Sequence, residues 1–273
     1  MRVVHSPLEL KKLLDDEQGT VGFVPTMGAL HLGHRSLIEA ARNDNDIVVV
    51  SIFVNPTQFL EGEDLDAYPR REEADKKVCE LSKVDYLFYP EADAMYGDDE
   101  VSLNAPNVRG YIMEGHSRPG HFSGVLTVVN KLFNIVNPTR AYFGKKDAQQ
   151  LMLIGAMVDN LFMSVEIVAM DTKREKDGLA MSSRNVYLSE PERVEALKIV
   201  KSLRLATQMV MRGELSVSKI REKMLAVLAP LAVEYVTVVD REFRPLEDIE
   251  IGNTIILVEA VSGTTRLLDN IWI

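Results

Sequence analysis

Two histidines in the segment VPTMGALHLGHRSL, residues 24–37, have the type and spacing that phosphate chemistry needs. His31 and His34 are three residues apart, so both side chains would lie on one face of the first turn of a helix. Two imidazoles there can donate hydrogen bonds to a phosphate, and the N–H groups of a helix N-terminus favour an anion. The segment contains neither a Walker A lysine nor the glycine spacing of a dinucleotide-binding loop. The alternative is a structural turn with two surface histidines.

Two later segments carry groups that suit the phosphates of a nucleotide. The first is FGKKDAQQL, residues 143–151, in which a glycine allows close approach of the backbone and two lysines bring positive charge. The second is GLAMSSRN, residues 178–185, in which two hydroxyls precede an arginine in a glycine-led loop. Each pattern alone is also typical of a solvated surface loop.

Neutral amides and further cations occur in two other segments. FVNPTQF, residues 53–59, contains two amides that could bind a hydroxyl or a carboxylate, or could instead cap a turn. HSRPGHFSG, residues 116–124, places an arginine and a histidine before a predicted helix, where a simple helix entry is the alternative. The acidic run EGEDLD, residues 61–66, could hold a cation, although a solvated loop fits it better.

The elements that must position these residues are short strands alternating with helices. The predicted strands are residues 20–24, 47–54, 84–88, 140–143 and 165–169. The predicted helices are one that begins at Pro7 with Ser6 as its cap, and residues 32–42, 70–82, 122–136 and 147–160. This alternation predicts an α/β fold with an open parallel sheet, which binds ligands at the carboxyl ends of its strands.

The pattern changes after about residue 171. Two helical segments, residues 190–212 and 218–228, are followed by three β-rich runs at residues 234–240, 254–260 and 265–272. We therefore expect residues 1–172 to form the sheet domain and residues 173–273 a smaller α+β domain.

Composition narrows the class of protein. With 273 residues the chain is long enough for roughly two domains of ~150 residues, or for one large domain. The net charge of −10 argues against a nucleic-acid coat, and the single cysteine allows no intrachain disulfide. The apolar runs are shorter than the ~20 residues that span a membrane, and no signal peptide is apparent. We expect a cytoplasmic protein with neither nucleic acid nor membrane as a partner.

Taken together and in this order, six segments resemble the pantothenate synthetase (pantoate–β-alanine ligase) family. They are PTMGALHLGH, SIFVNPTQF, DLDAYPR, HFSGVLTVV, FGKKDAQQL and DGLAMSSRN. This family lies in the nucleotidyltransferase superfamily that includes class I aminoacyl-tRNA synthetases. The resemblance implies a Rossmann-like doubly wound sheet domain and a C-terminal lid. It also implies ligation of (R)-pantoate to β-alanine through a pantoyl adenylate, with ATP as substrate, Mg²⁺ carried by ATP, and a homodimer.

The resemblance also implies roles for individual residues. The ATP-binding residues would be Met27, Gly28, Ala29, Leu30, His31, Leu32, Gly33, His34, Gly144, Lys145, Lys146, Asp147, Lys173, Met181, Ser182, Ser183 and Arg184. Pantoate would be bound by Gln58, Gln150 and Asn55, and β-alanine by Gln58, Arg118 and His121. The catalytic set would be His34 as proton donor with His31, Lys146 and Arg184. The chain departs from the family pattern at Lys145, commonly Glu, and at Lys173, usually Val.

Two other readings of the motifs stay open at this point. Another adenylyl- or cytidylyl-transferase of the superfamily would share the HLGH and MSSR segments but would not need NPTQF and HFSG together. A non-catalytic nucleotide sensor, or a truncated RNA-binding relative of the synthetases, would bind ATP without turnover. The net negative charge of the chain argues against an RNA-binding protein.

Overall fold

The computed structural model describes residues 1–273, which divide into two compact units. The first unit is Met1–Lys145 with Leu153–Asp171, and the second is Lys146–Met152 with Thr172–Ile273. The unit boundary at residues 171 and 172 lies one residue before the expected one. The sequence did not predict that residues 146–152 would group with the C-terminal part of the chain.

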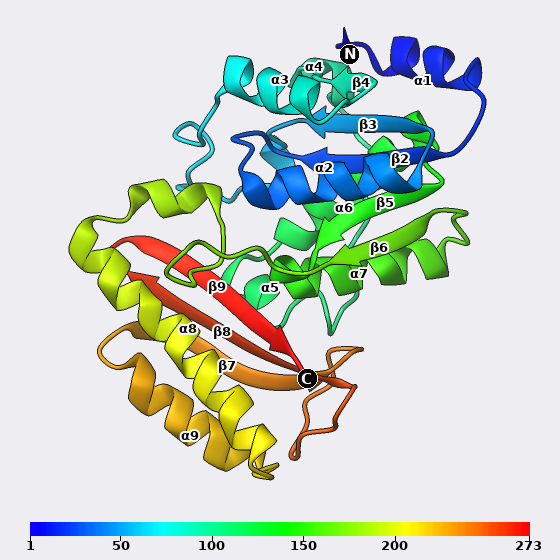
Figure 1. Cartoon of the computed structure of the whole chain (residues 1–273). Helices are drawn as coiled ribbons and strands as arrows, with labels where there is room; N and C mark the ends of the chain where they lie inside the picture. Colours follow the sequence, from blue (N-terminus) through cyan, green and yellow to red (C-terminus); the bar gives the residue numbers. More distant parts are fainter. The chain divides into compact units, whose positions relative to one another are not determined.

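The first unit contains a sheet of six parallel strands in the order β1-β4-β3-β2-β5-β6 (Figure 1). The strands are β1 (Arg2–Val4), β2 (Val21–Thr26), β3 (Ile47–Ile52), β4 (Tyr86–Phe88), β5 (Arg140–Gly144) and β6 (Glu166–Met170). The predicted doubly wound parallel sheet is therefore confirmed. Strand β1 was missed because three residues are too few for a periodic pattern.

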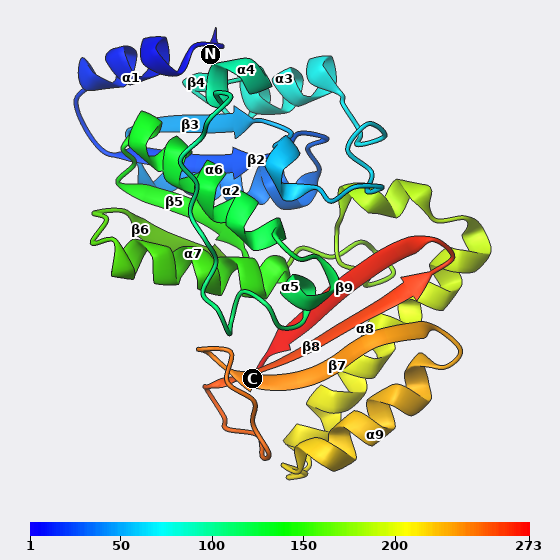
Figure 2. The same ribbon diagram turned by 180° about the vertical axis from the view of Figure 1, so that it is seen from behind.

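Helices flank this sheet on both sides (Figures 1 and 2). They are α1 (Pro7–Asp15), α2 (Leu32–Asp44), α3 (Glu72–Leu81), α4 (Ala92–Met95), α5 (Glu114–Ser117), α6 (His121–Val136) and α7 (Ala148–Asn160). Two 3₁₀ turns, η1 (Pro56–Gln58) and η2 (Lys145–Asp147), follow β3 and β5. The predicted cap of α1 is present, since Ser6 Oγ accepts a hydrogen bond from the Glu9 N–H.

Two apolar layers hold the sheet between its helices. On one face Val24 and Val50 pack with Ile38 of α2 and Cys79 of α3. On the other face Phe23, Phe133 of α6 and Phe143 meet edge to face. Neighbouring residues of a strand point to opposite faces, so Phe23 and Val24 serve different layers. Strand β3 is buried along its whole length, as its β-branched run predicted.

The order of strands reverses at β2, which is the switch point of the sheet. Strands β3 and β4 lie on one side of β2, and β5 and β6 on the other. Strand β2 pairs with β3 from Val21 to Thr26, but with β5 only at Gly22 and Phe23. The two-residue ladder leaves the carboxyl ends of β2 and β5 unpaired with each other. Open α/β sheets bind ligands at such a point.

The second unit is a three-stranded antiparallel sheet with two helices packed on it (Figure 1). The strands are β7 (Ala232–Asp240), β8 (Thr254–Ser262) and β9 (Thr265–Trp272), and the helices are α8 (Glu190–Met211) and α9 (Val217–Leu228). Leu203 of α8, Ile220 and Met224 of α9 and Val258 of β8 lie in its core. A 3₁₀ turn, η3 (Ser183–Tyr187), precedes α8.

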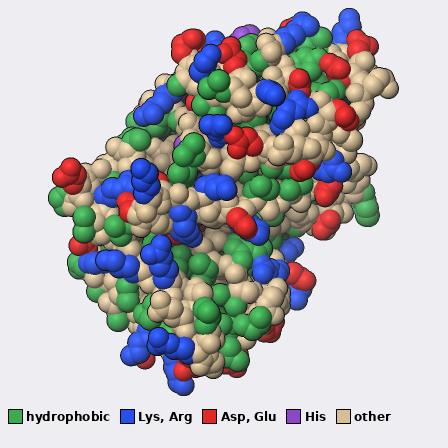
Figure 3. Space-filling model, viewed as in Figure 1, with side chains coloured by type: hydrophobic (Ala, Val, Ile, Leu, Met, Phe, Trp, Pro, Cys, Tyr) green, Lys and Arg blue, Asp and Glu red, His purple; other side chains and the backbone are tan.

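The surface carries charges of both signs. Figure 3 shows Lys and Arg side chains interspersed with Asp and Glu on the face seen in Figure 1. None of the helices combines the length and the apolar character needed to cross a membrane.

Candidate active site

The HLGH segment begins α2, after the turn that follows β2 at the carboxyl end of that strand. His31 is the N-cap of α2, and its Nδ1 accepts a hydrogen bond from the Gly33 N–H at 3.1 Å. The His31 N–H donates to His34 Nδ1 at 3.4 Å, so the two residues form a reciprocal capping box. Their rings stack with centroids 4.0 Å apart. The predicted pairing of the two side chains at the start of a helix is present.

These contacts decide where each ring carries its proton. A nitrogen that accepts a hydrogen bond from a main-chain N–H has no proton of its own. His31 and His34 both use Nδ1 in this way, so each neutral ring carries its proton on Nε2. The two imidazoles are thereby set as Nε2–H donors, which is the form that can hydrogen-bond to a phosphate oxygen.

Asp75 of α3 holds the turn that leads into the histidines. Its two carboxylate oxygens accept hydrogen bonds from the N–H groups of Ala29 at 2.8 Å and Leu30 at 2.7 Å. Gly28 and Ala29 have φ values of 87° and 49°, a left-handed conformation that costs free energy for alanine. Asp75 is 2% exposed, and burial raises the pKa of its carboxyl although the two N–H donors act to lower it. The carboxylate therefore stabilises a strained turn.

The amides after β3 form a second part of the site. Gln58 is 8% exposed; its Oε1 accepts from Asn55 Nδ2 at 3.2 Å and its Nε2 donates to Met27 Sδ. Asn55 is 1% exposed, its Nδ2 also donates to the Gly124 carbonyl, and its Oδ1 accepts from Tyr96 Oη at 2.7 Å. Asn55 is thus engaged on both sides of its amide, which suits it to orient Gln58.

Arg118 and His121 form a network around the main chain of Gln58. The Arg118 guanidinium donates to both oxygens of Glu63, at 2.6 and 2.5 Å, and to the Gln58 carbonyl at 3.2 Å. His121 Nδ1 lies 2.7 Å from the same carbonyl, so Nδ1 carries the proton, and Nε2 faces Arg118. Burial, with the adjacent Arg118 charge, lowers the pKa of His121 to about 4. His121 is neutral near pH 7.

The sequence suggested either a cation site or a solvated loop for the acidic run at residues 61–66. Glu63, within this run, fits neither. Burial acts to raise the pKa of Glu63, but the hydrogen bond and charge of Arg118 outweigh it and lower the pKa. The carboxylate is 22% exposed and pairs with an arginine, so it is neither a cation site nor a solvated loop residue.

The residues after β5 lie in η2 and α7. The Lys145 ammonium, at the end of the first unit, pairs with the exposed Asp171 carboxylate at 2.6 Å. In the second unit Lys146 is 20% exposed and its ammonium lies 3.3 Å from Asp147 Oδ1. Gln150, in the first turns of α7, is half-buried. Ion pairs of this kind at partly exposed positions contribute little stability.

The MSSR segment of the second unit is held in a compact loop. Ser182 caps η3, since its Oγ accepts from the Arg184 N–H at 3.3 Å. The Met181 N–H donates to the Lys173 carbonyl at 2.9 Å, which joins two segments predicted to bind ATP. Asn185 Nδ2 donates to Glu175 at 2.7 Å and closes the loop from the other side. Lys173 thus helps to hold this loop through its backbone carbonyl, while its side chain is exposed.

The predicted residues therefore fall into two groups, one in each unit. In the first unit Gln58 contacts Met27, Asn55, Arg118 and His121 directly. The same unit contains residues 28–34, Gly144 and Lys145. The second unit contains Lys146, Asp147, Gln150, Lys173 and residues 181–184.

Sequence reasoning missed Asp75, although a signal for it exists. Asp75 stands three and four residues before Val78 and Cys79, on the buried face of α3. An acidic residue on an apolar helix face is uncommon and requires partners. Those partners lie 45 and 46 residues away, so no local motif contains them.

A family model, related proteins and solved structures each match this chain over almost its whole length. A family model described as pantoate-beta-alanine ligase matches residues 2–272. A pantothenate synthetase of Sulfurimonas denitrificans is 62% identical over 273 residues, with 100% of both chains covered. A crystal structure of pantothenate synthetase from Thermus thermophilus has 42% identity, covers 99% of each chain and gives a TM-score of 0.95.

A solved structure with ligands is also similar. The pantoate-beta-alanine ligase of Francisella tularensis, complexed with beta-gamma ATP and beta-alanine, is 34% identical, covers 99% of this chain and 97% of its own, and gives a TM-score of 0.82. Family model, relatives and solved structures thus agree over nearly every residue. The chain belongs to the pantoate–β-alanine ligase family.

Proposed function

We propose that the chain ligates (R)-pantoate and β-alanine to pantothenate, with ATP consumed and AMP and diphosphate released through a pantoyl adenylate. Membership of the family makes it an ATP-dependent carboxylate–amine ligase. The observation that carries the residue-level proposal is the pair His31 and His34, whose Nδ1 atoms are both engaged by main-chain N–H groups. Both rings are thereby oriented as Nε2–H donors at the N-terminus of α2.

The first step activates the acid. A carboxylate oxygen of pantoate attacks the α-phosphorus of ATP, the bond from that phosphorus to the bridging oxygen breaks, and diphosphate leaves with the electron pair. Negative charge grows on the α-phosphoryl and bridging oxygens during this step. The proposal assigns the stabilisation of this charge to His31, His34, Lys146 and Arg184. His34 donates through Nε2–H, as the resemblance implies for the proton donor.

The second step forms the amide. The neutral amine of β-alanine attacks the acyl carbon of the adenylate, the bond from that carbon to the phosphate oxygen breaks, and AMP leaves. The nitrogen keeps one N–H in the amide, and its other proton passes to solvent water. We place the β-alanine near Gln58, Arg118 and His121, whose contacts with one another support a common subsite. The Arg118 guanidinium supplies positive charge and N–H donors that suit a substrate carrying a carboxylate, and neutral His121 accepts from Arg118 through Nε2.

Pantoate recognition is assigned to Gln58 and Gln150, with Asn55 in support. Gln58 is held between Asn55 and Met27, so its amide is oriented before any substrate arrives. Preorganised amides can donate to a carboxylate and accept from hydroxyl groups, which pantoate offers together. Asn55 contributes by fixing Gln58 rather than by touching the substrate.

We expect Mg²⁺ to bind together with ATP, held mainly by the phosphates of the nucleotide. The predicted ATP-binding residues are 27–34, 144–147, 173 and 181–184. The chain contains no group of three or more His, Cys, Asp or Glu side chains that could hold a metal ion. Mg²⁺ is commonly held by phosphates and one or two carboxylates, and Asp147, with 49% of its side chain exposed, is a fitting carboxylate. Bound Mg²⁺ would neutralise charge on the leaving diphosphate.

Three wider expectations stay predictions. The chain is expected to be cytoplasmic and homodimeric, and residues 173–273 are expected to act as a lid. If residues 173–273 act as a lid, saturating ATP should lower the radius of gyration measured by small-angle X-ray scattering. An unchanged radius would contradict this role.

Exchange of labelled diphosphate into ATP tests the proposed adenylate. The exchange should require pantoate and Mg²⁺ and should not require β-alanine, because only the first step is reversed. Exchange that needs β-alanine, or that occurs without pantoate, would contradict the two-step order.

A further inference from the structure

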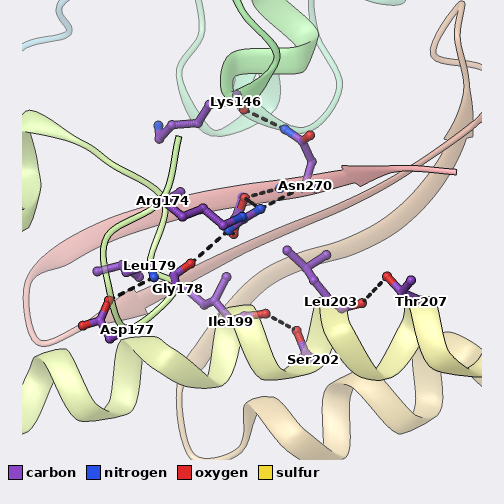
Figure 4. A network of polar contacts seen from close by, with 12 residues as sticks. Lys146, Arg174, Asp177, Gly178, Leu179, Ile199, Ser202, Leu203, Thr207 and Asn270 are labelled. Atoms are coloured by element: carbon purple, nitrogen blue, oxygen red, sulfur yellow. Dashed lines mark hydrogen bonds and ion pairs between the residues drawn. The ribbon is translucent and has the colours of Figure 1, made fainter. Parts of the chain in front are cut away.

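Near the end of β9, the last strand of the chain, two adjacent buried polar residues contact segments that contain predicted ATP-binding residues. Asp269 and Asn270 of β9 are each 3% exposed. Polar side chains buried to this extent need hydrogen-bond partners. Outside β9 their side chains contact Lys146 and Arg174, and all four residues belong to the second unit (Figure 4).

Asn270 holds the main chain of Lys146. Its Nδ2 donates to the Lys146 carbonyl at 2.7 Å, and its Oδ1 accepts from Trp272 Nε1 at 2.9 Å. An indole N–H can only donate, so it fixes Oδ1 toward Trp272 and Nδ2 toward Lys146. Figure 4 shows the Lys146 side chain extending away from Asn270, whose amide meets the backbone.

Asp269 makes the matching contact with the other segment. Its carboxylate accepts from Arg174 Nη1 at 2.6 Å and Nη2 at 3.0 Å, a two-pronged ion pair. Arg174 also donates to the Gly178 carbonyl at 3.2 Å and follows Lys173, whose carbonyl accepts from Met181. Two adjacent residues of β9 therefore hold both segments.

We propose that Asn270 is a positioning residue for adenylate formation, acting through Lys146. Lys146 lies in η2, a single 3₁₀ turn, so the direction of its side chain depends on how its own peptide unit is held. Asn270 fixes that unit and thereby aims the ammonium at the α-phosphoryl group. The inference rests on the proposed role of Lys146, and small misplacements of a catalytic group can cost about 100-fold in rate.

Asn270→Asp is the sharpest variant, because it preserves shape and the acceptor for Trp272 but removes the donor to Lys146. We expect pantoate-dependent exchange of diphosphate into ATP to fall ~10- to 100-fold. In a Lys146→Ala background the same change should alter the exchange rate less than about twofold, because residues that act through one another are not additive. Thr207→Val is the matched control, since it removes a side-chain hydrogen bond to the Leu203 carbonyl elsewhere in the second unit and should leave exchange unchanged.

A second variant covers the case in which Asn270→Asp does not fold. Trp272→Phe keeps an aromatic ring under Arg241 and removes the N–H that orients Asn270. The Trp272→Phe variant should lose less exchange activity than Asn270→Asp, and only when Lys146 is present.

The outcomes separate the inference from the proposed function. Equal losses in both backgrounds, or no loss with Lys146 present, would overturn the positioning role while the ligase function stands. Exchange that is unaffected by Lys146→Ala would refute the role of Lys146, and the inference with it. No exchange by the wild-type chain would refute the proposed function itself.

Discussion

Hydrogen bonds at Nδ1 distinguish His31 and His34 from two histidines on an ordinary helix surface. Each ring is committed to the tautomer with its proton on Nε2, and the Gly33 and His31 N–H groups enforce that choice. Such preorganisation stabilises transition-state charge because no reorientation is needed when the charge develops.

Two substitutions of His34 separate its two nitrogens. His34→Asn keeps an acceptor near Nδ1 but places no donor near Nε2, whereas His34→Gln can place an N–H there. We expect the Asn variant to lose ~100- to 1000-fold in adenylate formation and the Gln variant to lose less. Single-turnover formation of the adenylate measures both. A Gln variant slower than the Asn variant would contradict the assignment of Nε2 as donor.

Replacement of Gln58 or Gln150 by Ala should act on pantoate rather than on ATP. A hydrogen bond to a charged group contributes about 1.5–3 kcal/mol, so the KM for pantoate should rise ~10- to 150-fold. The KM for ATP should change little. Gln18→Ala, at an exposed position, is the control. Equal increases in both KM values would remove these residues from the pantoate site.

His121 predicts a specific pH dependence of stability. Its pKa is lowered from 6.5 to about 4 in the folded chain, so the unfolded chain binds one more proton between these values. Stability is therefore lost as pH falls from 6.5 toward 4. From pH 7 to pH 5 the wild type should lose about 2 kcal/mol of unfolding free energy relative to His121→Gln.

Urea unfolding at the two pH values measures this difference. A wild-type chain and a His121→Gln variant with parallel pH profiles would show that His121 is protonated in the folded state.

At the scale of elements, α6 approaches the turn η1 closely enough that only glycine fits between them. A Cβ at Gly124 would lie 2.3 Å from the Thr57 carbonyl oxygen and 2.9 Å from the Gln58 nitrogen. The Gly124 carbonyl also accepts from Asn55 Nδ2. The glycine of the HFSG motif therefore sets the distance between α6 and the residues that hold Gln58.

Gly124→Ala should displace η1 and Gln58. We expect a loss of about 1–3 kcal/mol in unfolding free energy, typical of overpacking, together with a higher KM for pantoate. Gly155→Ala in α7 is the matched control, because a Cβ there meets nothing within 4 Å. That control should stabilise the helix by about 0.5–1 kcal/mol. A Gly124→Ala variant that resembles the control would contradict the close approach.

The sequence predicted those elements whose pattern is local. The β-branched run of β3 and the Ser6 cap of α1 depend on neighbouring residues, and both are present. The clamp of Asp75 on Ala29 and the bond from Asn270 to Lys146 join residues 46 and 124 positions apart. Contacts at such separations depend on how the strands are ordered, which no motif encodes, so Asp75 and Asn270 were found only in the structure.

At the scale of the whole molecule, each unit is built around its own core and carries part of the predicted ATP-binding set. The homodimer expected from the resemblance predicts a solution mass of twice 30.6 kDa, or 61.2 kDa, by light scattering. A mass of 30.6 kDa at all concentrations would contradict that expectation.

The central claim is that this chain is a catalyst that activates pantoate with ATP and passes it to β-alanine. The most direct test measures AMP formed from ATP and Mg²⁺, with pantoate and β-alanine added singly and together. The account predicts sustained AMP formation only with both acids, with one pantothenate formed for each AMP. Tight ATP binding without AMP formation would contradict this claim and favour a nucleotide sensor. Diphosphate release only with a different acid would also contradict it, because the chain would then activate another substrate.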